Sequence, residues 1–523
     1  MYALYYIGHS VFVVMLLTLS VMLVREVLRL SLPPLRRKRV YIILKWTVLS
    51  LFSLLCVALA DRQFGSDRNF ESMRALFDNR EWMTDYAYEK GGIFDRSGLP
   101  ERALAQSMST RSGDFRRHYP FGEASGHLVG YSTRTRGRTG IEAVFMPVLT
   151  GVSSGRIENW PAHFVHLISS PKPRGKNVIL TVDSRLQDAA QQLLQGKRGS
   201  VIALNPDNGE ILAMVSSPGF SPAAAWSDST WNSLLERENE APFFNRSLRG
   251  LYPPGSIFKL VVAAAALENG MSPVLASGPD GFTPDGTHKP IHEHEKGEYL
   301  ARGLEWTGHG RLSMKKALQK SSNVYFAMLG SMIGAQALHE TAGRFGFNRS
   351  IGWNTASTSL DAGFEMKRSF FPGVNELSAS ALSWASIGQH KVLVSPMHVA
   401  LMTAAIANGG DLMLPSLELN RFPKTAQKVI SSATAGKLRE MMRLVVENGT
   451  GYRANVPGLA VAGKTGTAEI GNEEPHSWFI SFAPYNNPRL VIVTLVENGG
   501  YGSGVAARIT GKLYNAAKKF GYF

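Results

Sequence analysis

The stretch Tyr252-Pro-Pro-Gly-Ser256-Ile-Phe-Lys259-Leu-Val-Val-Ala-Ala-Ala-Ala-Leu-Glu268 joins a cluster of helix breakers to a strongly helical run. We therefore expect a helix that begins near Ser256. Free backbone N–H groups at a helix N-terminus favour developing negative charge. Lys259 follows Ser256 by three residues and so faces the same side of the helix. The pair predicts a hydroxyl nucleophile with an amine base beside it.

A second motif, Ser321-Ser322-Asn323, separates two helical stretches. A lysine-rich segment precedes it and an apolar run follows it. A short polar break between helices can project Ser321 and Asn323 into a cleft, where a hydroxyl relays a proton and an amide donates or accepts hydrogen bonds. The alternative for this motif alone is an ordinary helix cap.

A third motif, Lys464-Thr465-Gly466-Thr467, has the pattern of a strand. Alternation places Lys464 on the same face as Gly466, where the missing side chain lets a ligand backbone approach closely. Lys464 supplies a second cation, which would lower the basicity of Lys259. The two threonine hydroxyls can receive a carboxylate. Alone, the motif is also typical of an edge strand protected by a lysine.

No single motif decides the chemistry. Ser-x-x-Lys also occurs at residues 169–172 and 313–316, and an isolated match is most often a capping serine followed by a solvated lysine. The three motifs occur in the order nucleophile, polar break and cationic strand, each at a boundary between predicted elements. They are compatible with one cleft, and together they predict a serine acyl-transfer site.

Strand and helix patterns alternate along residues 178–523, which we expect to form one α/β domain. Strands are expected at 177–181, 200–204, 210–215 and 489–497, and helices at 183–194 (with an acidic cap) and 506–519. Strands near both ends of a domain, with helices between them, favour a mainly antiparallel sheet flanked by helices.

Two apolar stretches, at residues 4–24 and 40–60, each have the length of a membrane-spanning helix. Residues 25–39 carry six basic side chains against one acid, and positive charge marks the cytoplasmic side. We expect membrane helices at 1–24 and 40–60, with the rest of the chain outside. The alternatives are a cleaved signal peptide, although a basic leader is missing, and a buried core helix for the second stretch.

Residues 61–177 are polar and irregular, and we expect them to form a small stalk domain. Their glycine-rich pieces have the pattern of turns and, taken alone, predict no chemistry. The formal charge of the chain is +15, but outside residues 25–39 the basic residues are scattered, so no nucleic-acid partner is expected. The only cysteine, Cys56, excludes an intrachain disulfide.

With these motifs the chain resembles the class B penicillin-binding proteins, the monofunctional peptidoglycan D,D-transpeptidases. The resemblance covers residues 88–510 and implies the penicillin-binding, β-lactamase-like transpeptidase fold, an α/β fold with a mainly antiparallel sheet. Further landmarks support it. They are Asp95-Arg96, Gly140-Ile141-Glu142, Asn245-Arg246, His309-Gly310, Gly388-Gln389, Ser395-Pro396 and His476-Ser477-Trp478.

The resemblance implies a catalytic role for five residues. Ser256 attacks the carbonyl between the two terminal D-alanines of a stem peptide, and Lys259 accepts the serine proton. Ser321 relays a proton among Lys259, Lys464 and the leaving amine. Asn323 holds Lys259 and a substrate amide, while Lys464 supplies positive potential.

The resemblance also implies how substrate binds. Thr465 and Thr467, on either side of Gly466, receive the substrate carboxylate, and the backbone N–H groups of Ser256 and Thr467 form an oxyanion hole. An amine of a neighbouring stem peptide then takes the acyl group. β-Lactam antibiotics imitate the D-Ala-D-Ala end and trap Ser256. Neither a metal nor an organic cofactor is implied.

Some features depart from the family pattern. We expect two membrane segments where one is usual, the usual Gly-Gln-Gly reads Gly388-Gln389-His390, and Lys90 replaces an arginine. The stalk is short, so we expect larger recruiting or dimerising subdomains to be missing. Because no polymerase domain is found, we expect a separate membrane glycosyltransferase of the shape-elongation-division-sporulation type as partner. We place the protein in the bacterial inner membrane, in contact with lipid, with its catalytic domain on the periplasmic side.

One further cluster has donors at metal-like spacing, and some elongation-type relatives carry a metal in this stretch. Its members are His288, His292, Glu293, His294 and Glu295, near Asp285. The loop is polar and contains no cysteine, so we interpret it as a solvated surface loop without a metal.

Three other functions remain as alternatives. A D,D-carboxypeptidase would use the same chemistry with water as the acceptor. A β-lactamase would need a deacylating base, but no Glu-x-x-Leu-Asn follows Ser321, and residues 375–377 are only a faint echo of it. A non-catalytic scaffold or β-lactam sensor is the third, although the expected cytoplasmic segment, about fifteen residues, is too small to fold alone as a signalling domain.

Overall fold

The computed structural model describes residues 89–110, 115–133, 135–151, 175–355 and 364–523, and before them only Trp46 and Ser50. The predicted membrane helices, apart from those two residues, lie outside the described part, as do the basic loop and the start of the stalk. Among the described residues, no helix is both long and apolar enough to cross a membrane. The chain divides into two compact units, Met1–Thr84 and Asp85–Phe523, and the elements below belong to the second.

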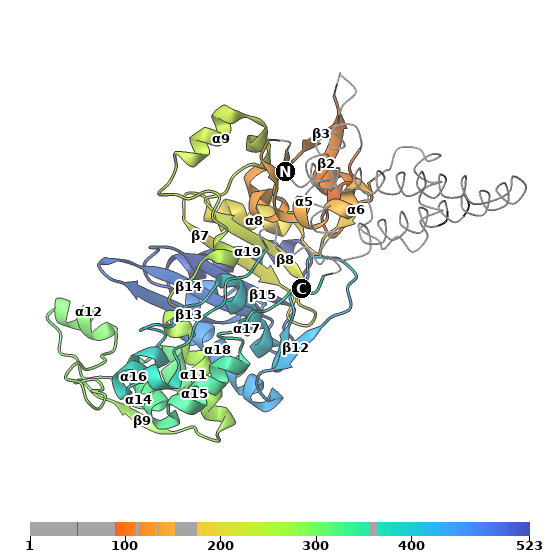
Figure 1. Ribbon diagram of the computed structural model, residues 1–523. Coiled ribbons are helices and arrows are strands. Elements are labelled where there is room, and N and C mark those ends of the chain that lie inside the picture. The colour runs from red at the N-terminus through yellow and green to blue at the C-terminus, as the bar shows by residue number, and fades with distance from the viewer. Residues whose placement is uncertain are drawn as a thin grey trace, which may run out of the picture. The chain divides into compact units, whose positions relative to one another are not determined.

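A five-stranded sheet lies at the centre of the second unit (Figure 1). Its order is β13-β14-β15-β7-β8, and every neighbouring pair is antiparallel. The strands are β7 (Gly199–Leu204), β8 (Ile211–Ser217), β13 (Ala462–Ile470), β14 (Glu473–Ala483) and β15 (Leu490–Val496). The predicted antiparallel sheet is confirmed, with the expected hairpin as β7 and β8 and the expected last strand as β15.

Side chains along the strands alternate between two hydrophobic cores, because successive residues of a strand point to opposite faces. Ile202 and Val493 belong to the core that also contains α11 (Lys259–Glu268) and α17 (Pro396–Ala407). Val201 and Ile492 belong to the core formed with α8 (Ser184–Leu194) and α19 (Val505–Lys519). Burial on both faces explains why β15 is apolar almost throughout.

Both predicted flanking helices, α8 and α19, are confirmed, and the side chain of Asp183 caps α8 by accepting from the backbone N–H of Arg185. The other main helices are α9 (Asp228–Leu235), α10 (Arg246–Arg249), α12 (Glu295–Ala301), α13 (Met314–Lys320), α14 (Asn323–Ile333), α15 (Ala335–Arg344), α16 (Ala379–Ser386) and α18 (Ser432–Asn448). Two short antiparallel pairs complete this part: β9 (Val274–Ser277) with β10 (Gly310–Ser313), and β11 (Asp411–Met413) with β12 (Thr425–Lys428).

The described part of the stalk contains a small sheet of order β3-β2-β1-β6. Its strands are β1 (Ile93–Phe94), β2 (Ala103–Ser109), β3 (Phe115–His118) and β6 (Val178–Ile179), and α5 (Gly140–Val144) and α6 (Met146–Thr150) follow β3 in the chain. Asp95 ties the stalk to α8, because its Oδ2 atom accepts from the N–H and the hydroxyl of Ser184, at 3.2 and 2.7 Å.

Turns of the stalk enclose buried charge, which the sequence alone did not indicate. The Nε atom of Arg117 donates to Oε1 of Glu142 at 2.8 Å, and both side chains are almost inaccessible to solvent. The amine of Lys90, also buried, donates to the hydroxyl of Ser132 at 2.8 Å. Removing one partner of the Arg117–Glu142 pair would leave an uncompensated buried charge, which is strongly destabilising.

A second buried network holds the segment that leads to Ser256. One oxygen of Glu497, just after β15, accepts from the hydroxyl of Tyr252 at 2.7 Å and from Nε of Arg246 at 2.8 Å. The other oxygen accepts from Arg198 at 2.7 Å. Burial acts to raise the pKa of Glu497, but the bond from Tyr252 and the charges of Arg246 and Arg198 outweigh it and lower that pKa.

Replacing Glu497 with Gln should destabilise the domain by about 3–5 kcal/mol, because the fully buried Arg246 then lacks its counter-charge. The folded state lowers the pKa of Glu497, so its stabilisation is present above the unfolded pKa and is lost as the pH falls through the folded one. Thermal unfolding of both proteins should therefore differ at neutral pH and converge in acid. Arg198→Gln, which removes a half-exposed partner, should cost less than about 1 kcal/mol; equal losses for both variants would contradict this account.

Candidate active site

Ser256 lies in a short 3-10 turn, Gly255–Ile257, and not in the first turn of an α-helix as we expected. The α-helix α11 begins at Lys259. The prolines before the turn and the φ of +54° at Gly255 explain why the α-helix begins only after Ser256, because neither conformation continues a regular helix. The side chain of Ser256 is partly exposed and has no hydrogen-bond partner among the described residues.

The turn is pressed against the edge strand β13. A Cβ atom at Gly255 would lie 2.3 Å from the carbonyl oxygen of Thr467, and a Cβ at Gly466 would lie 2.9 Å from the carbonyl oxygen of Pro254. The turn that carries Ser256 fills the space that a side chain at Gly466 would take, and the approach of a ligand backbone to Gly466 stays a prediction. The close contact of turn and strand fixes the position of Ser256.

A loop from α16 supports the turn from another side. The N–H of Gly255 donates to the carbonyl of Gly388 at 3.0 Å. His390 stands where the family usually has glycine, and its φ is +61°, the left-handed region that favours glycine. The side chain of His390 is exposed, and no hydrogen bond joins it to a motif residue in the described part of the chain.

Lys259 is fully buried and donates two short hydrogen bonds. Its amine lies 2.6 Å from the carbonyl oxygen of Ser321 and 2.7 Å from Oδ1 of Asn323. Burial lowers the pKa of Lys259 to about 7, and the negative charges of Glu293 and Glu295 act in the opposite direction. A substantial fraction of this amine is therefore neutral at neutral pH.

Lys464 approaches the same serine from β13. Its amine donates to the Oγ atom of Ser321 at 2.7 Å and to the carbonyl of Thr465 at 2.9 Å. Burial, followed by the charge of Lys259, lowers the pKa of Lys464 well below its ordinary value. Ser321 lies between the two amines, so the structure brings the second and third motifs and Lys259 of the first together, as their order predicted.

The two threonines of the third motif differ in environment. Thr465 is buried, and its hydroxyl shares a hydrogen bond of 2.7 Å with the hydroxyl of Thr450. Thr467 is partly exposed, and its hydroxyl accepts from the N–H of Gly502 at 3.3 Å. Thr450 was not among the predicted site residues. Its only local signal is the glycine on either side of it, which is common in turns.

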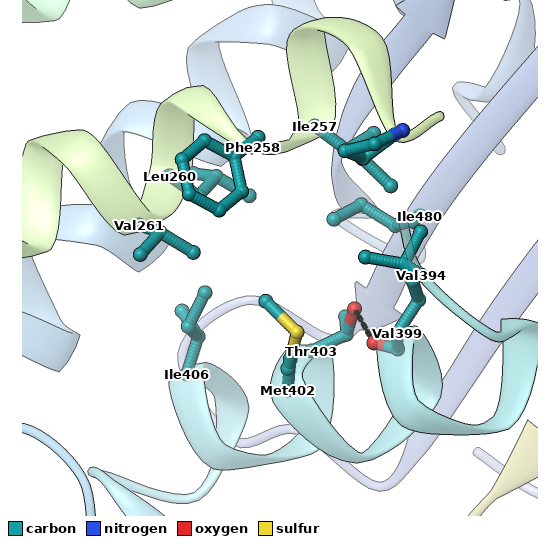
Figure 2. A pocket seen from close by; sticks show the side chains of 11 residues that line it. Ile257, Phe258, Leu260, Val261, Val394, Val399, Met402, Thr403, Ile406 and Ile480 are labelled. Atoms are coloured by element: carbon teal, nitrogen blue, oxygen red, sulfur yellow. Dashed lines mark hydrogen bonds between the residues drawn. The ribbon is translucent and has the colours of Figure 1, made fainter. Parts of the chain in front are cut away.

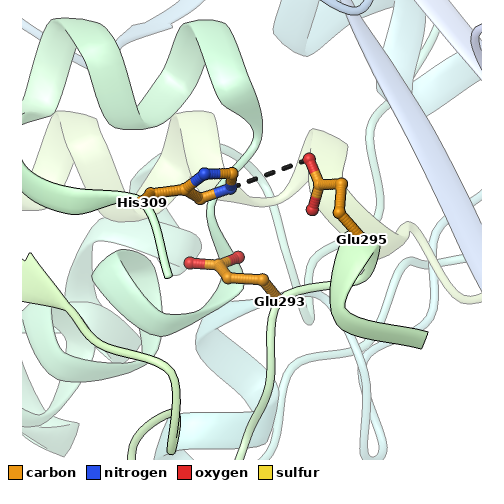
Figure 3. A group of neighbouring side chains, drawn as sticks. All are labelled: Glu293, Glu295 and His309. Carbon is orange, nitrogen blue, oxygen red and sulfur yellow. Dashed lines mark ion pairs between the residues drawn. The ribbon is translucent and has the colours of Figure 1, made fainter. Parts of the chain in front are cut away.

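The loop at residues 285–295 is only partly the solvated surface loop that we expected. His288 and His294 are exposed, but Glu293 is buried and bonded to the second motif. Glu293, Glu295 and His309 each place one potential ligand atom within 4.8 Å of those of the other two, and Figure 3 shows the three side chains together. Both oxygens of Glu293 already accept protein hydrogen bonds, and Glu295 lies 3.7 Å from His309. That the loop binds no metal stays a prediction.

A small cavity of about 20 Å³ lies between the turn of Ser256, α11 and α17 (Figure 2). Its walls are apolar, including Ile257, Val261 and Ile406, and the one lining hydroxyl, on Thr403, donates to the carbonyl of Val399. The space matches about one water molecule but offers no free polar partner, so it is a packing defect and not a binding site.

A serine on a turn, a buried lysine one turn later and a second buried lysine on an edge strand define an acyl-transferase of the penicillin-binding type. Comparison with known proteins agrees. The family profile described as penicillin binding protein transpeptidase domain matches residues 199–515. The chain is 32% identical over 486 residues to the peptidoglycan D,D-transpeptidase PbpA of Mycolicibacterium smegmatis, covering 86% of this chain and 91% of that protein.

Solved structures give the same result. Penicillin-binding protein A of M. tuberculosis, in its ceftriaxone acyl-enzyme complex, aligns with a TM-score of 0.72 and 28% identity, over 83% of this chain and 99% of the other. PBP2 of Pseudomonas aeruginosa, in complex with WCK 5153, aligns with a TM-score of 0.68 and 28% identity, over 82% of this chain and 96% of the other. The chain belongs to the class B penicillin-binding proteins, whose enzyme class is the serine D,D-transpeptidases.

The stalk also has a match. Residues 97–178 fit the family profile described as penicillin binding protein A dimerisation domain. We expected larger recruiting or dimerising subdomains to be missing, and for the dimerising one this expectation is wrong at the level of homology. The prediction failed because it was based on the length of the stalk alone.

Gly255→Ala tests whether contact with β13 positions Ser256. The new Cβ would lie 2.3 Å from a backbone atom, so the turn must shift, and we expect the rate of Ser256 acylation by a fluorescent penicillin to fall at least about tenfold. Gly270→Ala is the matched control, because Gly270 also has a positive φ but open space around it. Equal acylation rates in the two variants would show that the contact does not position the serine.

Proposed function

We propose that this chain crosslinks peptidoglycan by serine acyl transfer, with Ser256 as the nucleophile. The observation that carries the proposal is the convergence of Lys259 and Lys464 on Ser321 beside the turn of Ser256. The Ser256 oxygen adds to the carbonyl between the terminal D-alanines of a donor stem peptide. The C–N bond then breaks, the last D-alanine leaves with a proton, and an acyl-enzyme remains.

Lys259 is the general base in this proposal. A neutral amine has two N–H groups and one lone pair, and the carbonyl of Ser321 and the amide oxygen of Asn323 accept the two short bonds. The lone pair is then free to take the proton of the Ser256 hydroxyl. The lowered pKa of Lys259 supports this role, because a base must be unprotonated at the working pH.

Ser321 and Lys464 carry the proton to the leaving amine. The Oγ atom of Ser321 accepts from Lys464, so its own hydrogen is free to move toward the departing nitrogen. The backbone N–H groups of Ser256 and Thr467 stabilise the oxyanion, and removing one such donor typically costs about 10²–10³ in rate. Thr467, with Thr465 beside it, binds the donor carboxylate. An amine of a second stem peptide then attacks the acyl-enzyme and closes the crosslink.

β-Lactams should acylate Ser256 by the same route, with the amide of the lactam ring in place of the D-Ala-D-Ala bond. The amide opens, its carbonyl carbon stays bound to the serine oxygen and its nitrogen takes the proton. Acyl-enzyme complexes of a structural relative with ceftriaxone, imipenem and penicillin G support this proposal.

We place the protein in the bacterial inner membrane, with the catalytic domain on the periplasmic side. The apolar stretches at 4–24 and 40–60 and the basic residues between them support this location. We propose that a separate membrane glycosyltransferase supplies the glycan strands, since the matched families are a transpeptidase domain and a dimerisation domain. Co-purification from membranes of a glycan polymerase tests the partner; its reproducible absence would contradict it.

Incubation of the purified chain with two distinguishable stem peptides tests the function. We expect a crosslinked heterodimer together with one released D-alanine per bond, and neither product with Ser256→Ala. Release of D-alanine without dimer would identify a D,D-carboxypeptidase, which uses water as the acceptor. Undiminished crosslinking by Ser256→Ala would exclude Ser256 as the nucleophile.

The rate of acylation by a fluorescent penicillin should rise with pH and level off above the pKa of Lys259, near 7. The sign follows from the role of the amine, because protonated Lys259 cannot accept the serine proton. Rate constants measured between about pH 5 and pH 9 would show this limb. A rate independent of pH in this range would contradict the assignment of Lys259 as the base.

A further inference from the structure

Glu293 is a buried carboxylate outside the three motifs, and it contacts the second of them directly. Only 3% of the residue is exposed. Its Oε1 atom accepts from the hydroxyls of Ser277, at 2.7 Å, and Ser322. Its Oε2 atom accepts from the backbone N–H of Asn323 at 2.6 Å. The carboxylate therefore joins β9 to the first residue of α14.

The residue before Glu293 fixes the amide of Asn323. Nδ2 of Asn323 donates to the carbonyl of His292 at 3.1 Å. Because the nitrogen of the amide is engaged there, its oxygen must point the other way, toward Lys259. A two-way backbone bridge between Ile291 and Phe282 holds this segment in place.

The backbone that Glu293 holds is strained. Ser321 has a φ of +61°, a conformation that costs a residue other than glycine roughly 1–2 kcal/mol. The strain presents both the carbonyl and the hydroxyl of Ser321 to the lysines. Glu293 anchors the two residues that follow, Ser322 and Asn323, and so opposes relaxation of this turn.

Glu293 is also one of the few negative charges near the two amines. Among the described residues, six groups surround Lys259. They are Lys464 from β13, Ser321 after α13, Asn323 at the start of α14, the ring of Phe326, and the carboxylates of Glu293 and Glu295. Glu293 acts without touching Lys259, so it adds negative potential but does not take a proton or a hydrogen bond from the base.

We propose that Glu293 is a positioning residue of the transpeptidase: it orients Asn323 and the backbone of Ser321 so that the lone pair of Lys259 faces Ser256, and its charge sets how basic that amine is. The inference rests on the proposed role of Lys259 and extends it. Among the described residues, Glu293 makes its hydrogen bonds to Ser277, Ser322 and Asn323 and none to Ser256 or Lys259. Its effect reaches the reaction through Asn323 and Lys259.

Glu293→Gln tests this in the purified full-length chain, by the rate of Ser256 acylation by a fluorescent penicillin as a function of pH. The glutamine places an N–H group among three donors, so we expect the rate on the plateau to fall at least about tenfold. Loss of the negative charge should lower the pKa of Lys259, and the acid limb should move down by about one pH unit. Glu298→Gln, an exposed position of α12, should leave both unchanged.

In Glu293→Gln, a lower plateau with an unmoved acid limb would mean a merely structural role and would overturn the proposal, as would a plateau and limb identical to the wild type. Glu293→Asp keeps the charge but shortens the side chain, so its limb should stay while its plateau falls. If the glutamine variant does not fold, Glu293→Asp still tests the orienting role of the side chain, and a wild-type plateau in that variant would overturn the proposal. If the wild-type chain itself is not acylated at any pH, the proposed function fails instead.

Discussion

Two lysine amines lie out of water on either side of one serine hydroxyl, and the rest of the cleft is organised around this arrangement. Lys259 and Lys464 are both fully buried, and each donates to Ser321. Two like charges in such a site repel each other, and each has lost its hydration. Burial therefore lowers both pKa values. The site stabilises a neutral amine, which is the species that proton abstraction requires.

The surroundings keep these amines from acquiring a counter-ion. Within the described residues, no ion pair joins either lysine to a carboxylate, and the acceptors are carbonyl, hydroxyl and amide oxygens. A carboxylate in direct contact would favour the charged form and remove the base at neutral pH. Glu293 contacts neither amine directly. It is hydrogen bonded to Ser322 and to the backbone N–H of Asn323, and its negative charge acts on Lys259 from there.

The sequence predicted the fold well where local pattern determines structure. The β7–β8 hairpin, the apolar β15 and the capped α8 follow from alternation, turn residues and an acidic cap, all of which are local. The exact start of α11 did not follow, because the prolines and Gly255 impose a 3-10 turn through contact with β13. The packing of the Ser256 turn against Gly466 did not follow either, because that turn is more than 200 residues away in the chain.

The catalytic motifs could be predicted because each carries its chemistry within four residues. Glu293 could not, since it precedes Asn323 by 30 residues and lies in a polar loop that resembles a solvated one. Only the packing of that loop against β9 and α14 shows that its carboxylate is buried. Thr450 was missed in the same way. A threonine between two glycines has no distinctive sequence pattern, and only the fold brings its hydroxyl to Thr465 of β13.

Direct titration of the Lys259 amine tests the central claim most closely. Lysine labelled with ¹³C at Cε and ¹⁵N at Nζ would report the charge of each amine by NMR, and loss of one resonance in Lys259→Arg would assign it. We expect the amine of Lys259 to titrate with a pKa of about 7, well below the ordinary value of 10.5. A Lys259 amine that remains protonated up to the ordinary value would contradict it.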